Sequence, residues 1–154
     1  MVYLLYKVHS ICVVSMVSPH ILVIDDENSW LKNLELMLSF KNYQITTTIS
    51  GKDGLELIKN SPDKYDLVLL DLMIPDLSGL EIMTALQPVF ASKKINVIMQ
   101  TGTPDHEDIK QTLAMGAICC LGKPYGHKEL YPLIDMVLSG QEPKEKIIYP
   151  KFGQ

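Results

Sequence analysis

Four apolar runs in this chain each end in residues that can bind phosphate or metal. ILVIDD ends in Asp25 and Asp26, YDLVLLD in Asp71, INVIMQT in Thr101, and AICCLGKP carries Lys123 near its end. Short runs of Ile, Val and Leu that alternate with helix-length segments predict a parallel sheet buried on both faces. Because parallel strands share one carboxyl edge, we expect these five side chains to meet in one crevice.

Five strand–helix units are predicted between residues 19 and 140, which gives an α/β fold with a doubly wound sheet. Gly51 and Gly54 are expected to bracket a turn before the second helix, and Pro88 to stop the third. The predicted strands cover residues 21–24, 44–49, 66–70, 95–99 and 117–121, and the predicted helices 29–40, 55–59, 80–87, 105–115 and 127–138.

Composition favours one small domain and disfavours several functions. The 154 residues can bury one core, and the formal charge of −4 supplies no basic field for nucleic acid. Cys119 and Cys120 are adjacent on a predicted strand, where their side chains point to opposite faces and cannot share a metal. We therefore expect neither nucleic-acid binding nor a zinc site.

The two ends of the chain lie outside the predicted domain of residues 19–140. Residues 1–18 are apolar but contain Lys7 and fall short of the ~20 apolar residues of a membrane-spanning helix. Translation could begin at Met16, or the extension could be a membrane-surface anchor or an extra strand. Residues 141–154 form a short tail, either disordered or docked on the last helix, which predicts a stand-alone cytoplasmic domain without an effector.

The predicted crevice favours phosphoryl chemistry. Two carboxylates 4 Å apart repel by about 4 kcal/mol at an effective dielectric constant of 20, so a cluster of three indicates a cation site. Hard oxygen ligands favour Mg²⁺. Asp71 could then act as a nucleophile toward phosphorus, with Lys123 supplying positive charge and Thr101 a hydroxyl donor.

The motifs that carry these residues resemble the response-regulator receiver domain of two-component signalling. The resemblance covers residues 20–140, in the manner of stand-alone chemotaxis receivers. It rests on IDDE at 24–27, DLMIPD at 71–76 followed by Gly79, TG at 101–102 and KP at 123–124.

Membership of this family implies a flavodoxin-like sheet of strand order 2-1-3-4-5 and a signalling module rather than an enzyme. It also implies a phosphoryl donor, either a histidine kinase or a histidine phosphotransfer protein, and a downstream protein that the sequence does not identify. The residues implied are Asp71 for phosphorylation; Asp25, Asp26, Asp71 and the backbone carbonyl of Met73 for Mg²⁺; Thr101 and Lys123 for the phosphoryl oxygens; and Pro124 after a cis peptide bond.

One position departs from the family pattern. Receivers commonly carry Tyr or Phe three residues before the lysine, and here that residue is Cys120. A thiol cannot provide the two-position aromatic switch, so a pseudo-receiver that binds partners without phosphorylation remains the alternative. A haloacid-dehalogenase-like phosphatase is disfavoured because Met73 stands where its second aspartate would be.

Overall fold

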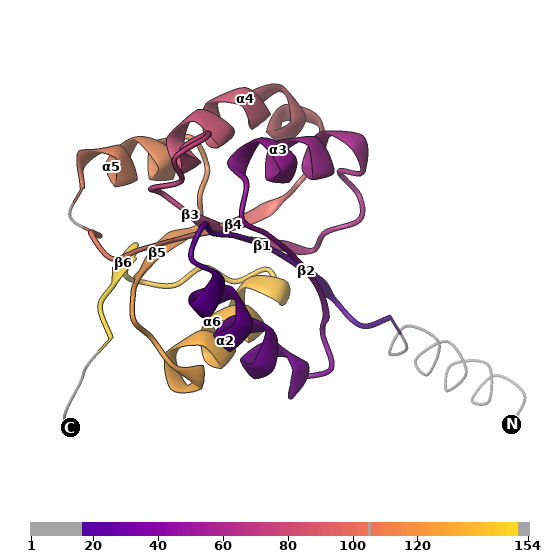
Figure 1. Cartoon of the computed structure of the whole chain (residues 1–154), viewed down its shortest axis with the longest axis vertical. Coiled ribbons are helices and arrows are strands. Elements are labelled where there is room, and N and C mark those ends of the chain that lie inside the picture. The colour runs from indigo at the N-terminus through magenta and orange to yellow at the C-terminus, as the bar shows by residue number, and fades with distance from the viewer. Residues whose placement is uncertain (1–16, 105, 151–154) are drawn as a thin grey trace, which may run out of the picture.

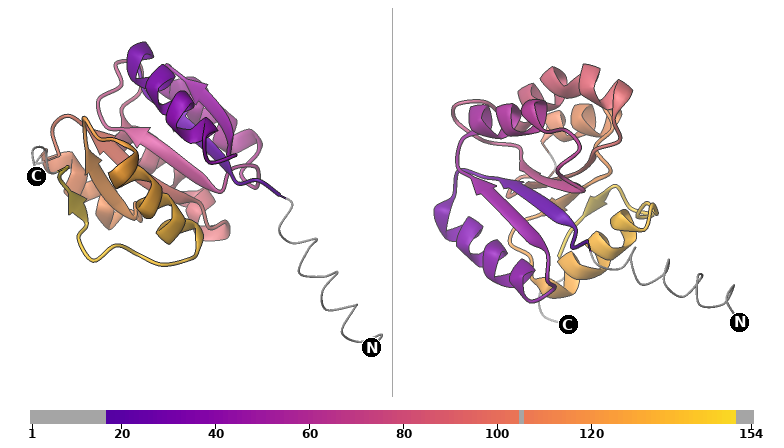
Figure 2. Two further views of the ribbon diagram at one scale, coloured as in Figure 1. Left: turned by 90° about the horizontal axis from the view of Figure 1, so that it is seen from below. Right: turned by 90° about the vertical axis from the view of Figure 1, so that its right-hand side faces the viewer.

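In the computed structural model, the chain folds into a twisted parallel sheet with helices on both faces (Figures 1 and 2). The structure describes residues 17–104 and 106–150, and within these ranges the sheet has six strands in the order β2-β1-β3-β4-β5-β6. The strands are β1 (His20–Ile24), β2 (Gln44–Thr48), β3 (Leu67–Asp71), β4 (Asn96–Thr101), β5 (Cys119–Gly122) and β6 (Ile147–Ile148).

Helices α3, α4 and α5 cover one face of the sheet, and α2 and α6 cover the other (Figure 1). No helix in the described part of the chain is long and apolar enough to cross a membrane. The helices are α2 (Asn28–Ser39), α3 (Gly51–Asn60), α4 (Gly79–Ser92), α5 (Glu107–Ala114) and α6 (His127–Leu138).

Strand β3 shows why the central strands read as continuous apolar runs. All five of its residues are buried. Val68 and Leu70 belong to the core under α3, α4 and α5, whereas Leu67 and Leu69 belong to the core under α2 and α6. Alternate side chains thus enter different apolar layers, which explains the apolar run that precedes Asp71 in this strand. The predicted fold class and the strand order 2-1-3-4-5 are confirmed.

The turn predicted around Gly51 and Gly54 was wrong, because both residues lie inside α3. Ser50 caps this helix by accepting a hydrogen bond from the backbone N–H of Asp53. A Cβ at Gly51 would stand 2.1 Å from the carbonyl oxygen of Leu77, and one at Gly54 2.5 Å from an Ile24 side-chain carbon. The glycines therefore permit close packing of the helix.

Two other helix boundaries differ from the prediction. Helix α4 continues through Pro88 to Ser92, although a proline removes one backbone hydrogen bond. Val89 and Phe90 beyond the proline pack against the core, which offsets that loss. Helix α5 begins at Glu107, because the ring of His106 caps it through the backbone N–H of Asp108; the predicted start at residue 105 lies outside the described residues.

Residues 147–148 of the C-terminal tail form a sixth strand beside β5. Within the described residues 141–150 the predicted disorder was therefore wrong, and the predicted docking on the last helix did not include this strand pairing. The backbone N–H of Cys120 donates to the carbonyl oxygen of Lys146 over 2.8 Å, and Ile147 pairs with Cys120 in parallel register. Ile147 also packs against the core that contains Cys120. Residues 1–16 of the N-terminal extension (residues 1–18) lie outside the described residues, so its alternatives stay predictions.

Candidate functional site

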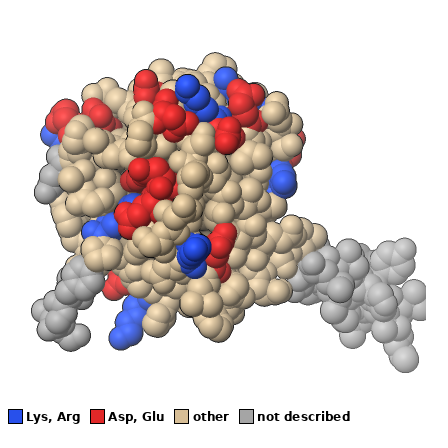
Figure 3. Space-filling view, in the orientation of Figure 1, with Lys and Arg blue, Asp and Glu red and all other residues tan. Residues whose placement is uncertain are grey.

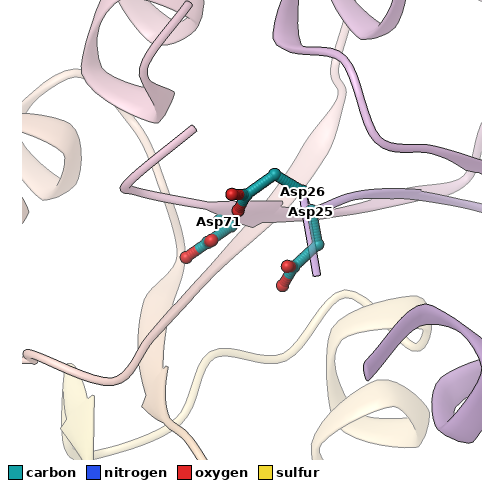
Figure 4. A group of neighbouring side chains, drawn as sticks. All are labelled: Asp25, Asp26 and Asp71. Carbon is teal, nitrogen blue, oxygen red and sulfur yellow. The ribbon is translucent and has the colours of Figure 1, made fainter. Parts of the chain in front are cut away.

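Three aspartates meet at the carboxyl edge of the sheet. Asp71 is the last residue of β3, and Asp25 and Asp26 follow directly after β1. One oxygen of each carboxylate lies within 4.8 Å of the other two, and Figure 4 shows the Asp25 carboxylate directed toward the layer of α2 and α6. In the space-filling view, acidic side chains gather between the two helix layers (Figure 3).

Lys123 is shared between two of these carboxylates. Its Nζ lies 2.6 Å from Asp25 Oδ2 and 3.7 Å from Asp71 Oδ2. Its backbone N–H donates to the carbonyl oxygen of Thr101 over 2.8 Å, which joins the ends of β4 and β5. The Lys123–Pro124 peptide bond is cis. One lysine thus pairs with two of the three carboxylates, and its single positive charge cannot balance all three.

Burial makes this charge costly. Burial raises the pKa of Asp71 to about 6; Lys123 opposes this rise, while Asp25 and Asp26 add to it. Burial also raises the pKa of Asp25 against the hydrogen bond from Lys123. Carboxylate oxygens are the hard ligands that Mg²⁺ prefers in proteins, and a bound cation would reduce the repulsion among the three carboxylates. These residues therefore fit that ion.

Thr101 is buried at the end of β4, at the same edge of the sheet. Its Oγ1 accepts a hydrogen bond from the backbone N–H of Thr103 over 3.2 Å and lies 3.3 Å from the Thr103 hydroxyl. The Thr101 hydroxyl is therefore held by its own loop.

Cys120 is fully buried in β5. Burial raises the pKa of its thiol to about 12, so the thiol is neutral at physiological pH. Cys120 pairs with Ile147 of β6, which packs against the same core. Neither side chain is the aromatic ring that the family commonly has at the position of Cys120.

Sequence reasoning missed the role of Gln100, which borders the site. Gln100 is buried beside Thr101, and its side chain contacts Asp25, Trp30 and Tyr125. The sequence did contain a signal for this role, since Gln100 is the last residue before Thr101 in the apolar run INVIMQT. A buried amide needs hydrogen-bond partners, so an amide in such a run indicates polar groups nearby.

Asp76, the last residue of the DLMIPD motif, also connects two segments next to the site. Its carboxylate accepts hydrogen bonds from the Ser50 hydroxyl (2.7 Å) and from the backbone N–H groups of Gly51 (2.9 Å) and Lys52 (3.1 Å). These bonds, with that of Ser50 the strongest, lower the pKa of Asp76 to about 2. Asp76 thereby joins the loop after β3 to the start of α3.

The sequence profile of the response regulator receiver domain matches residues 21–135. The chain belongs to this family. The response regulator ArlR of Staphylococcus aureus (strain Mu50) is 35% identical over 127 residues, which cover 82% of this chain and 56% of ArlR. The chain thus spans about half the length of the curated relatives that it matches.

Solved receiver structures share the fold. A CheY-like receiver domain protein from Methanospirillum hungatei is 27% identical with a TM-score of 0.73, covering 81% of this chain and 97% of that one. A receiver domain protein from Clostridium thermocellum is 25% identical with a TM-score of 0.68, covering 79% and 95%. The BeF3-activated DrrB receiver domain is 26% identical with a TM-score of 0.67, covering 80% and 99%.

Proposed function

We propose that this receiver accepts a phosphoryl group on Asp71 from a histidine kinase or histidine phosphotransfer protein. The observation that carries the proposal is the cluster of Asp25, Asp26 and Asp71 beside Lys123 at one sheet edge. In the transfer, an oxygen of Asp71 bonds to phosphorus while the bond from phosphorus to the donor histidine nitrogen breaks, and the imidazole keeps the electron pair.

Asp25, Asp26, Asp71 and the backbone carbonyl of Met73 would hold Mg²⁺. When bound, this ion neutralises charge on the oxygens of the transferring group. Asp71 is the only one of the three carboxylates that ends a strand, and its pKa of about 6 leaves it ionised and nucleophilic at pH 7 and above.

Lys123 and Thr101 would bind the phosphoryl oxygens. The Lys123 ammonium lies 3.7 Å from Asp71 Oδ2, close enough to reach a group attached there. Thr101 would exchange its contact with Thr103 for a hydrogen bond to a phosphoryl oxygen, and this exchange would move the loop between β4 and α5.

The proposed output is phosphorylation-dependent binding of a cytoplasmic protein, or relay of the phosphoryl group onward. Moving a two-state surface from 1:99 to 99:1 requires about 5.5 kcal/mol, which a new dianionic group beside a lysine can supply. A pseudo-receiver is the second candidate, and Cys120 is the residue that favours it, because it lacks the aromatic ring of the usual switch.

Intact mass after incubation with acetyl phosphate tests the proposal. We expect one phosphoryl adduct that requires Mg²⁺ and is missing from Asp71→Asn. Asp63→Asn is the matched control, since this exposed aspartate pairs with Lys93 away from the cluster. Beryllium fluoride with Mg²⁺ offers a second probe of the same site that needs no phosphoryl donor.

Absence of both the adduct and the beryllium fluoride complex would contradict the phosphoacceptor proposal and favour the pseudo-receiver. An adduct that persists in Asp71→Asn would place the modification on another residue.

A further inference from the structure

Gln100 is an unusual residue for its place in the fold. It lies on β4, a strand with neighbours on both sides, and its side chain is fully buried. Ile98, two residues earlier, belongs to the core under α2 and α6, so Gln100 points into the same layer. A buried amide without hydrogen-bond partners destabilises a protein. The partners of the Gln100 amide therefore explain how this residue is tolerated in the core.

Both ends of the Gln100 amide have partners from other elements. Nε2 donates to Asp25 Oδ2 over 3.1 Å. Oε1 accepts from the indole N–H of Trp30 over 3.1 Å and from the hydroxyl of Tyr125. The amide therefore links the aspartate cluster to the start of α2 and to the loop before α6.

The chemistry of these partners fixes which way the amide faces. An indole N–H only donates and an ionised carboxylate only accepts. Reversal of the Gln100 amide would set its NH₂ group against the Trp30 N–H and its oxygen against the Asp25 carboxylate. The orientation with Nε2 toward Asp25 is thus required at both ends.

The Asp25 carboxylate accepts hydrogen bonds from two further donors, and only one of the two would move on phosphorylation of Asp71. The backbone N–H of Glu27 binds Oδ1 over 3.0 Å, and Lys123 binds Oδ2 over 2.6 Å. Lys123 would leave Oδ2, at least in part, to reach a phosphoryl group on Asp71. Gln100 then remains as the side-chain donor to Oδ2.

We propose that Gln100 is a positioning residue for the metal site, which holds the Asp25 carboxylate in its ligating orientation while Trp30 and Tyr125 direct the amide. This inference rests on the proposed Mg²⁺ site. Hydrogen bonds that orient metal ligands typically change metal affinity 10–100-fold when removed.

Mg²⁺ affinity of the full chain tests this role without any phosphoryl transfer. It is obtained from the rise of the thermal unfolding midpoint with Mg²⁺ concentration, followed by circular dichroism. We expect Gln100→Met, which keeps the volume and loses both hydrogen-bonding groups, to weaken Mg²⁺ binding about 10–100-fold. Trp30→Phe and Tyr125→Phe each keep a ring and remove one donor, so each should weaken binding less.

A double variant separates positioning from packing. If Trp30 acts through the amide, then Trp30→Phe has no further effect on Mg²⁺ affinity in the Gln100→Met background. Ile98→Val is the matched control, because it removes one methyl group from the same face of β4 without touching Asp25. It should lower stability and leave Mg²⁺ affinity unchanged.

The outcomes distinguish this inference from the proposed function. If the unfolding midpoint of the wild-type protein does not change with Mg²⁺ concentration, the proposed metal site is overturned, and the role of Gln100 with it. Wild-type protein that binds Mg²⁺ no more tightly than Gln100→Met would overturn the positioning role alone. Equal effects of Trp30→Phe in both backgrounds would show that Trp30 does not act through Gln100.

Discussion

Replacement of Asp71 by asparagine should stabilise the metal-free protein. Asp71 is 5% exposed, and the pKa of its carboxyl rises from 3.8 to about 6, chiefly by burial. The folded state therefore binds the Asp71 proton more tightly than the unfolded state, and ionisation of this group opposes folding. Asparagine removes the charge and keeps the shape.

The size of the effect follows from the pKa of Asp71. One pKa unit corresponds to about 1.4 kcal/mol, so ionised Asp71 costs the fold about 3 kcal/mol above pH 6. For a chain of this length, 1 kcal/mol moves the unfolding midpoint by about 2–4 °C, which predicts a rise of roughly 6–12 °C for Asp71→Asn at pH 7.5.

Chemical denaturation in the presence of a chelator, from pH 4 to pH 8, measures this difference. Wild type and variant should converge near pH 4, diverge as the pH rises from about 4 to about 6, and keep a nearly constant difference above pH 7. Saturating Mg²⁺ should stabilise wild type more than the variant and narrow the gap. Equal stability at pH 7.5 without metal, or a less stable variant, would refute the reasoning; Asp63→Asn should show no such pH-dependent gain.

Three further changes have defined outcomes. Asp76→Ala should lower the melting temperature at pH 7 because three donors lose their acceptor. Since the pKa of Asp76 is lowered to about 2, the difference in melting temperature between wild type and variant should shrink as the pH falls from about 4 toward 2. A difference that does not depend on pH would contradict this role of the carboxylate. Gly102→Ala should fold normally, because an added Cβ meets nothing within 4 Å, and should slow hydrolysis of the phosphorylated protein by narrowing access for water, as the decay of the adduct mass will show. Removal of residues 141–154 should speed hydrogen exchange at the Cys120 amide, which donates to Lys146; unchanged exchange would mean that β6 contributes no protection.

The sheet and the aspartate cluster were predictable because they depend on strong local patterns. Apolar runs indicated the four strands β1, β3, β4 and β5, and the shared edge of a parallel sheet indicated that Asp25, Asp26 and Asp71 would meet. The pattern is informative because β3 must be apolar on both faces.

The features that sequence reasoning missed depend on contacts between distant segments. Whether Gly51 opens a turn or packs against Leu77 is decided by the loop after β3, which local propensity does not include. The partners of Gln100 come from segments 70 and 25 residues away. β6 has only two residues, too few for a periodic signal to reveal it.

β6 also determines which edge of the sheet is open to strand addition. An edge strand presents unpaired backbone groups that can recruit another chain. Without the tail, the four residues of β5 would form such an edge; with it, the exposed row shortens to Ile147–Ile148. Within residues 17–104 and 106–150, the longer open edge is then β2, whose sequence QITTT is largely polar. Aggregation through strand pairing should therefore start at β2 in the intact domain, and at β5 as well once the tail detaches.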